Sequence, residues 1–429
     1  MFVERSAARI RRARAIFLVV GALPFVALVA WAVQRGSAGH REQIRDRWQR
    51  AVGLGLVIEA VEHPRPGMTR ARGVSVVSPT GGRIATLPVV EVEAAADEDR
   101  LRFEGVRLDA PLATVLGDLG REWLRRDARH PRSCVIDVAH VGWPGDDATA
   151  DAASGPRPLR IECVARGMAR AVRVTRPGAA EDVLRVVRTV IAGADGADRE
   201  SYEVEVACDE AVPLAVVAGL AGLHGDVTAV TGDSAVVAGR CSAASDEGGW
   251  HGEWSGRVLG IDLARCVAPL GARGGGAARA EIVRLAWQDG RLVDAAGRFD
   301  VGTGWIDAAF ADRLTLALGC RPTQAPAPDG ERRFDAAGFE MRIEGGRVVV
   351  TAPSGTPRAL AIADGVVVID EPAAAVPFER LAWVLSPPSA DFVPAGGAGA
   401  WLMTIQPRGD GRESGRSAGP TARGGGRGF

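Results

Sequence analysis

An aspartate recurs at the end of five predicted strands, each time directly after an apolar residue or a cysteine. These residues are Asp109, Asp209, Asp262, Asp307 and Asp370. A short apolar helix is expected after each of them, and a carboxylate at that position accepts hydrogen bonds from N–H groups of the first helical turn. Five acids could also suggest catalysis, but all five share one place between a strand and a helix. The pattern therefore predicts five helix N-caps and no catalytic residue.

The other reactive side chains form no recognisable catalytic or metal-binding motif. The six histidines stand apart in the sequence, and no HExxH pair occurs among them. Residues 415–419 match the G-x-S-x-G motif, which requires a strand before it and a helix after it, but they lie in a tail of Gly, Arg and Ser. We predict a protein that is not an enzyme and has no cofactor or metal. An exported enzyme is the alternative if His224, His251 and acidic residues gather in one pocket.

The composition excludes further classes of function. The chain has no Lys and no Asn, so all 52 basic residues are Arg. Schiff-base chemistry and Walker-type phosphate loops, which both need Lys, are excluded. The formal net charge of −1 gives no general reason to expect nucleic acid as a partner. Asp146, Asp147 and Asp151 lack the spacing of a calcium loop and predict a solvated acidic loop.

Six cysteines leave the question of disulfides open. None of them forms a CxxC pair, which argues against a zinc ribbon or a thioredoxin-like site. An even number of cysteines in an exported domain permits disulfides, but six cysteines allow 15 pairings. Small buried thiols are the alternative.

Residues 15–34 predict a membrane anchor, because no charged residue interrupts them. As a helix the apolar part spans roughly 28 Å, close to the ~30 Å hydrocarbon core of a bilayer. Pro24 lies in the middle of this span and is expected to kink the helix. The residues that we assign to the membrane anchor include Ala15, Phe17, Pro24, Phe25, Trp31 and Val33.

The charges on either side of the anchor predict its orientation. Arg9, Arg11, Arg12 and Arg14 lie close before it, whereas only Arg35 lies close after it. The positive-inside rule then predicts that residues 1–14 lie in the cytoplasm and that the body is exported to the periplasmic side of the inner membrane. A cleaved signal peptide is the alternative, because residues 30–32 fit a small-x-small cleavage site, although the apolar run exceeds the usual 7–15 residues.

The rest of the chain predicts a β-rich α+β fold with a mostly antiparallel sheet and short helices packed on it. A helical stalk is expected over residues 35–52, followed by one body over 53–406 with a possible sub-boundary near 145–157. Apolar and polar residues alternate along many segments, and Asp289-Gly290, Gly345-Gly346 and Asp364-Gly365 suit tight hairpin turns. Helices are expected from Pro111 and over 182–191, 213–223, 263–270, 308–318 and 378–385. Residues 401–405 predict a last strand, and 407–429 a disordered tail.

The first quarter of the chain resembles the AsmA-like/TamB superfamily of bacterial envelope proteins. The resemblance lies in the anchor, the stalk ending at 48–52, the strand 53–61, the breaker 64–67 and the strand 73–79. It implies an inner-membrane anchor and an elongated, curved sheet whose apolar inner face forms a groove for lipid acyl chains. It also implies a role in phospholipid movement or outer-membrane assembly.

Two functions follow as hypotheses. The first is a non-enzymatic envelope protein that handles lipid, with membrane phospholipids as its partners. The second is a structural subunit of an envelope or secretion complex that binds other proteins at its sheet edges. Nucleic acid is not expected, because an exported Arg/Gly tail would meet none.

Overall fold

The computed structural model describes residues 7–52, 55–77, 82–94, 98–125, 133–142, 158–177, 182–192, 198–221, 224–246, 249–354 and 358–384. The chain divides into two compact units, an N-terminal unit over 1–183 and a C-terminal unit over 184–429. The predicted strand at 401–405, the tail at 407–429 and the acidic loop at 146–151 lie outside the described residues. The predicted sub-boundary near 145–157 falls inside the N-terminal unit, and the division itself comes at 183/184.

The described residues begin with a long helix that is apolar from Ala15 to Val33. Helix α1 (Ala7–Phe17) continues through a π-helical turn, η1 (Leu18–Ala22), into α2 (Leu23–Arg35). In the π-helical turn Leu23 N–H donates to the Leu18 carbonyl, one residue further back than in an α-helix. The wider turn immediately precedes Pro24, whose ring would clash with the carbonyl of Val20 in a regular α-helix. Pro24 is thus accommodated by a change in helical winding.

The segment after the anchor is a separate helix that packs on the sheet. Helix α3 (Ala38–Val52) starts after Ser37, whose Oγ accepts a hydrogen bond from His40 N–H at 3.2 Å. Ile44 is buried and Trp48 packs beside it against Leu56 and Ile58 of the first strand. The helix predicted for this segment is confirmed, but its apolar stripe faces the sheet instead of standing free as a stalk.

The sheet of the N-terminal unit starts as an antiparallel meander. Its strands are β1 (Gly55–Arg65), β2 (Met68–Val77), β3 (Arg83–Ala94) and β4 (Glu98–Phe103). After the short strand β5 (Val106–Arg107), helix α4 (Ala110–Arg125) leads to β6 (Ser133–Val138), which pairs parallel with β4. Strand β7 (Val141–Gly142) pairs with β5, and β8 (Leu159–Arg166) and β9 (Ala169–Thr175) continue the sheet antiparallel beyond β6. The order β4-β6-β8-β9 therefore contains one parallel step.

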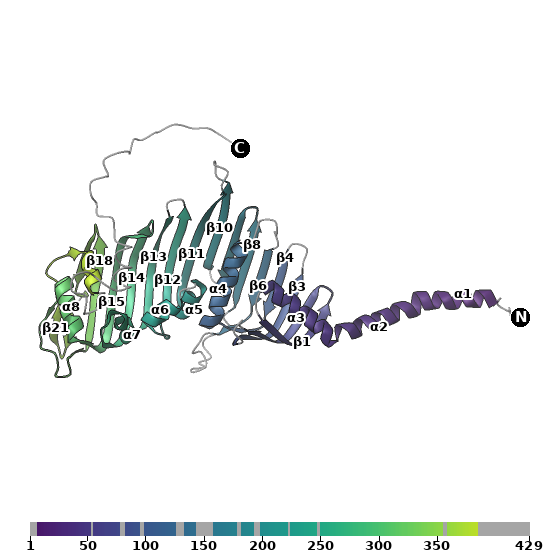
Figure 1. The fold of residues 1–429 in the computed structure, drawn as a ribbon, viewed down its shortest axis with the longest axis horizontal. Coiled ribbons are helices and arrows are strands. Elements are labelled where there is room, and N and C mark those ends of the chain that lie inside the picture. The colour runs from purple at the N-terminus through teal and green to yellow at the C-terminus, as the bar shows by residue number, and fades with distance from the viewer. Residues whose placement is uncertain are drawn as a thin grey trace, which may run out of the picture. The chain divides into compact units, whose positions relative to one another are not determined.

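The C-terminal unit repeats a hairpin followed by helices at one end of its sheet (Figure 1). Strands β10 (Asp182–Ala192) and β11 (Asp198–Pro213) precede α5 (Leu214–Ala221) and α6 (His224–Thr231). Strands β12 (Val236–Asp246) and β13 (Gly249–Asp262) precede α7 (Leu263–Val267) and the 3₁₀ turn η3 (Ala268–Leu270). Strands β14 (Gly274–Gln288) and β15 (Arg291–Asp307) precede α8 (Ala308–Leu318). The hairpin turns lie at the opposite end of the strands.

Short strands close the end of this unit. They are β16 (Arg321–Pro322), β17 (Glu331–Phe334), β18 (Ala336–Glu344), β19 (Arg347–Thr351), β20 (Ala359–Ala363), β21 (Val366–Asp370) and β22 (Val376–Pro377), followed by α9 (Glu379–Val384). Phe378 is completely buried in the core that α8 and α9 share with these strands. The predicted β-rich α+β class, mostly antiparallel and with short helices on the sheet, is confirmed.

Local turn chemistry agrees with the predicted hairpins. Asp289 and Gly290 have φ angles of 53° and 71°, and Asp364 and Gly365 have 49° and 74°. Both residues of each pair occupy the left-handed region that a type I′ turn needs.

The helix predicted over 182–191 is wrong, because this segment is strand β10. It pairs with β11 from Leu184 opposite Val206 to Ala192 opposite Asp198. Its many β-branched residues suit a paired strand.

Candidate functional site

Three of the five aspartates lie at the start of a helix and accept a hydrogen bond there. Asp109 Oδ1 accepts from Leu112 N at 2.9 Å, and Asp262 Oδ1 accepts from Ala264 N at 3.0 Å. Asp307 Oδ1 accepts from Phe310 N at 2.6 Å. Asp307 is also buried, and its Oδ2 accepts from Arg273 N at 2.6 Å. These carboxylates are occupied by backbone donors, which is a structural role.

The other two aspartates do not cap a helix, so this prediction is wrong for them. Asp209 lies within β11, which continues to Pro213, and its exposed carboxylate lies 3.6 Å from the guanidinium of Arg240. Asp370 is the last residue of β21 and is paired with Arg321 and Ala359 in the sheet. No helix begins after it until Glu379. Sequence alone could not show that strand β11 continues beyond Asp209.

Histidine and acidic side chains are the other candidates for chemistry. Among the described residues, no group of three or more His, Cys, Asp or Glu side chains could hold a metal ion. His251 lies in β13 beside a hollow of about 280 Å³ that Glu203 and Glu205 also line, whereas His224 begins α6. His40 and His63 form a pair with their Nε2 atoms 2.9 Å apart. Burial, followed by the charges of Arg35 and His40, lowers the pKa of His63.

The residues of the predicted anchor are exposed along the apolar helix. Ala15 and Phe17 belong to α1, and Pro24, Phe25, Trp31 and Val33 to α2. Over Arg14–Arg35 the helix is long and apolar enough to cross a membrane, and none of its most apolar window is buried in the protein. At its end the guanidinium of Arg35 stacks over the Trp31 ring at 4.2 Å, the residue pair that membrane–water interfaces favour.

One face of the C-terminal unit's sheet is apolar across eight strands. Residues directly opposite each other on antiparallel strands point to the same face. One such row runs through Leu184, Val206, Cys241, Trp254, Leu285, Ala295, Ile343 and Val348. We call the face that carries this row the apolar face. Sequence reasoning found the alternation within single strands, but only the register joins these residues into one surface.

The apolar face is unequally covered. Near the helix end of the strands, Val237, Val258 and Val301 are buried in the core with helices α7 and α8. Towards the hairpin end, Val204, Val206 and Ala243 are only half-buried. Tyr202 and Trp250 stack there with ring centroids 6.3 Å apart, and Trp250 remains 44% exposed. The hairpin half thus presents partly accessible apolar and aromatic side chains.

The opposite face carries charge in alternating order. Arg257 lies opposite Glu281, Glu281 opposite Arg298, and Arg298 opposite Glu340. Opposite charges at directly paired positions stabilise neighbouring strands. Arg279 and Arg298 both reach Asp300, at 3.2 Å and 2.9 Å. We call this surface the charged face.

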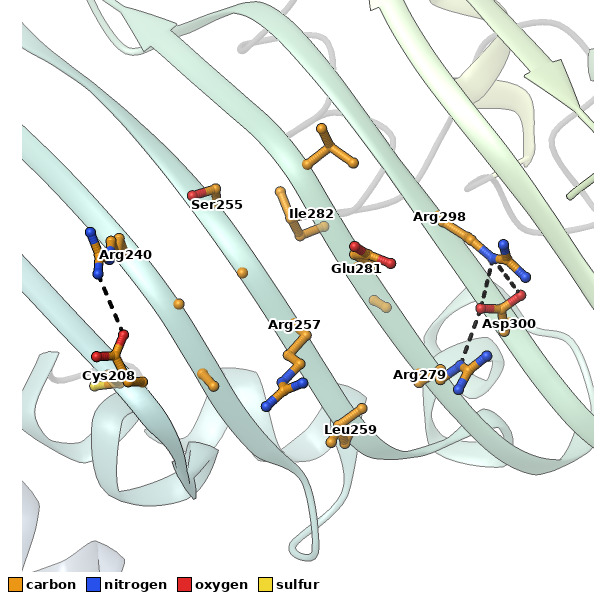
Figure 2. A pocket seen from close by; sticks show the side chains of 16 residues that line it. Cys208, Arg240, Ser255, Arg257, Leu259, Arg279, Glu281, Ile282, Arg298 and Asp300 are labelled. Atoms are coloured by element: carbon orange, nitrogen blue, oxygen red, sulfur yellow. Dashed lines mark hydrogen bonds and ion pairs between the residues drawn. The ribbon is translucent and has the colours of Figure 1, made fainter. Parts of the chain in front are cut away.

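An open hollow of about 770 Å³ lies over the charged face (Figure 2). Four neighbouring strands each contribute one arginine to it: Arg240 from β12, Arg257 from β13, Arg279 from β14 and Arg298 from β15. Three acids line it as well, Asp209, Glu281 and Asp300, so four positive charges against three negative leave a formal excess of one. In Figure 2 Arg257 lies between Arg240 and Arg279, and no ion pair joins it to the residues drawn.

The excess positive charge of this hollow can attract an anion. The hollow also differs from the expected apolar groove, because charged side chains line it. Sequence reasoning missed it because its arginines lie far apart in the chain and only strand register brings them together. Comparisons of the chain with protein-family models, with curated proteins and with solved structures found no match.

Proposed function

We propose that this chain is a non-enzymatic protein of the bacterial envelope, anchored in the inner membrane, which handles lipid on the apolar face of its C-terminal unit. The anchor helix Arg14–Arg35 and its flanking arginines support the location, with the N-terminus in the cytoplasm and the body exported. The resemblance of the first quarter to AsmA-like proteins supports the same class.

The accessible hairpin half of the apolar face carries the lipid proposal. Side chains such as Val204, Val206 and Ala243 are half-buried instead of sealed in a core. A contiguous, partly exposed apolar surface is uncommon on a protein without a partner for it. An acyl chain matches such a surface because it needs no hydrogen bonds and because its transfer out of water lowers the free energy.

Photo-crosslinking of the full-length protein in cells tests this proposal. A photoreactive residue at Val204, on the apolar face, should form adducts with phospholipid. The matched control is the same residue at Glu203, which is adjacent in β11 and points to the charged face. Equal labelling at both positions, or no lipid adduct at Val204 in correctly folded protein, would refute lipid handling on this face.

A second candidate, an assembly subunit of an envelope or secretion complex, is favoured by Arg257 in the charged hollow. A guanidinium between Arg240 and Arg279 would suit the carboxylates of an acidic protein segment. A photoreactive residue at Ser255, an exposed residue that also lines the hollow, leaves Arg257 intact and should then give a protein adduct of discrete mass. Loss of that adduct in Arg240→Ala/Arg279→Ala, with lipid labelling at Val204 unchanged, would separate the two functions.

The topology needs its own test. A C-terminal alkaline phosphatase fusion should be active if the body is exported, and N-terminal sequencing should find residues 1–14 on the mature chain. An inactive fusion would refute the export, and a chain that starts after Ala32 would show cleavage of the apolar segment.

A further inference from the structure

Two cysteines of the N-terminal unit lie directly opposite each other in the sheet. Cys134 in β6 is the register partner of Cys163 in the antiparallel strand β8. Opposite residues of an antiparallel pair have Cα atoms about 4.5–5.5 Å apart, which lies inside the range of about 4.4–6.8 Å that a disulfide spans. Both thiol side chains are half-buried, so a reagent can still approach them.

We propose that Cys134 and Cys163 are a modification site, a cross-strand disulfide that forms when the chain meets an oxidising disulfide. The reagent is a thiol–disulfide oxidant, such as an exported oxidoreductase or oxidised glutathione. The thiolate of one cysteine attacks the oxidant's disulfide and forms a mixed disulfide, which expels one thiolate. The second cysteine then attacks this mixed disulfide, so the protein gains one S–S bond, loses two protons and passes two electrons to the oxidant.

The remaining cysteines of the C-terminal unit do not share this geometry. Cys241 lies opposite Val206, whereas Cys208 lies opposite Gly239, so the two cysteines are diagonal neighbours. Diagonal positions are about 7–8 Å apart, beyond the reach of an unstrained disulfide. Cys266 lies in helix α7, and Cys320 is buried two residues after the end of α8. Burial raises the pKa of Cys320 to about 11, so its thiolate form is scarce at neutral pH.

The position of the bridge suggests what it does. It would join β8 to β6, the strand that also makes the parallel pairing with β4. Parallel pairing is slightly weaker per residue than antiparallel pairing. The bridge would also close a loop of about 30 residues, which restricts the unfolded chain. We therefore expect the disulfide to hold β8 on β6, next to the parallel pairing of β6 with β4.

Peptide mapping of the full-length protein tests the pairing directly. The protein, purified in detergent, is equilibrated with oxidised glutathione, its remaining thiols are alkylated, and it is digested with trypsin. Because cleavage is blocked before Pro158, Cys134 falls in the peptide Ser133–Arg160 and Cys163 in Ile161–Arg166. We expect these two peptides to be linked, with Cys208 and Cys241 alkylated. Alkylation of both Cys134 and Cys163, or a link from either to another cysteine, would overturn the proposal.

In cells, the disulfide proposal rests on the proposed export, because export brings the chain to the oxidant. Two further measurements distinguish a failure of the disulfide proposal from a failure of the proposed export. In the full-length oxidised protein, reducing agent should lower the thermal midpoint of the wild type by on the order of 5–10 °C and leave that of Cys134→Ser/Cys163→Ser unchanged. An equal response of both proteins would count against the bridge. Linked peptides in purified protein but not in acid-trapped cells would count against export and not against the pairing.

Discussion

Replacing Asp307 should destabilise the C-terminal unit far more than replacing any other aspartate of the recurring pattern. Its carboxylate is 9% exposed and uses both oxygens, one for Phe310 N–H in the first turn of α8 and one for Arg273 N–H before β14. The side chain thereby joins the start of α8 to the start of the β14–β15 hairpin, which Asp307 itself ends. Asp307→Ala removes both hydrogen bonds at once.

The expected loss follows from these two contacts. Loss of an N-cap costs about 0.5–2 kcal/mol, and a polar group left without its partner in a buried place costs about 1–3 kcal/mol. Together they predict about 2–4 kcal/mol for Asp307→Ala. Asp307→Asn should lose less, because Asn still caps the helix through its carbonyl oxygen but presents an NH₂ group to the Arg273 N–H. Asp262→Ala, which loses the bond to Ala264 N and an exposed ion pair with Arg265 at 3.9 Å, should cost about 1 kcal/mol.

Urea unfolding of the full-length protein in detergent, followed by tryptophan fluorescence, measures these differences. With a slope of about 2 kcal/mol per molar urea, Asp307→Ala should lower the midpoint by about 1–2 M. Asp209→Ala is the matched control, because Asp209 belongs to the same sequence pattern but makes only an exposed ion pair. If Asp209→Ala destabilises as much as Asp307→Ala, the reasoning from capping and burial is wrong.

Three further outcomes are expected. The pKa of His63 is lowered below its ordinary 6.5, so the unfolded chain binds the proton more readily than the folded one. In urea unfolding, the contribution of His63 to the free energy of unfolding should be complete above pH 6.5 and fall as the pH drops below it, and the difference between wild type and His63→Gln should show this fall. Gly290→Ala should cost about 1–2 kcal/mol, because φ is 71° there although space is free, and a normal urea midpoint would contradict this. Gly239→Ala should cost more, because φ is 153° and a Cβ would collide with the Ser255 carbonyl; a smaller loss than for Gly290→Ala would speak against this contact.

The two faces of the sheet in the C-terminal unit suit different partners. Val206 and Ala207 are neighbours in β11, but Val206 belongs to the apolar row while Ala207 lies opposite Arg240 on the charged face. A lipid and an acidic protein segment would therefore engage opposite sides of the same strands. Labelling at adjacent residues can distinguish these partners without disrupting the sheet.

The sequence by itself determined the features that depend on nearest neighbours. An uninterrupted apolar run specifies a helix long enough to span a membrane, whatever packs beside it. Asp-Gly pairs specify tight hairpins because both residues tolerate positive φ. Alternation of apolar and polar residues specifies strands with two unlike faces, as in Phe339 to Ile343.

Only the tertiary structure decided the features that depend on distant partners. Asp209 and Asp307 have similar local sequences, but β11 continues past Asp209 because its following residues find partners in β12, as Val212 does opposite Val237. Residues 182–191 become a strand because β11 offers a complete ladder. The apolar row, the four arginines of the hollow and the Cys134–Cys163 pair all arise from strand register. Register is set by pairing across the sheet, which no single stretch of sequence encodes.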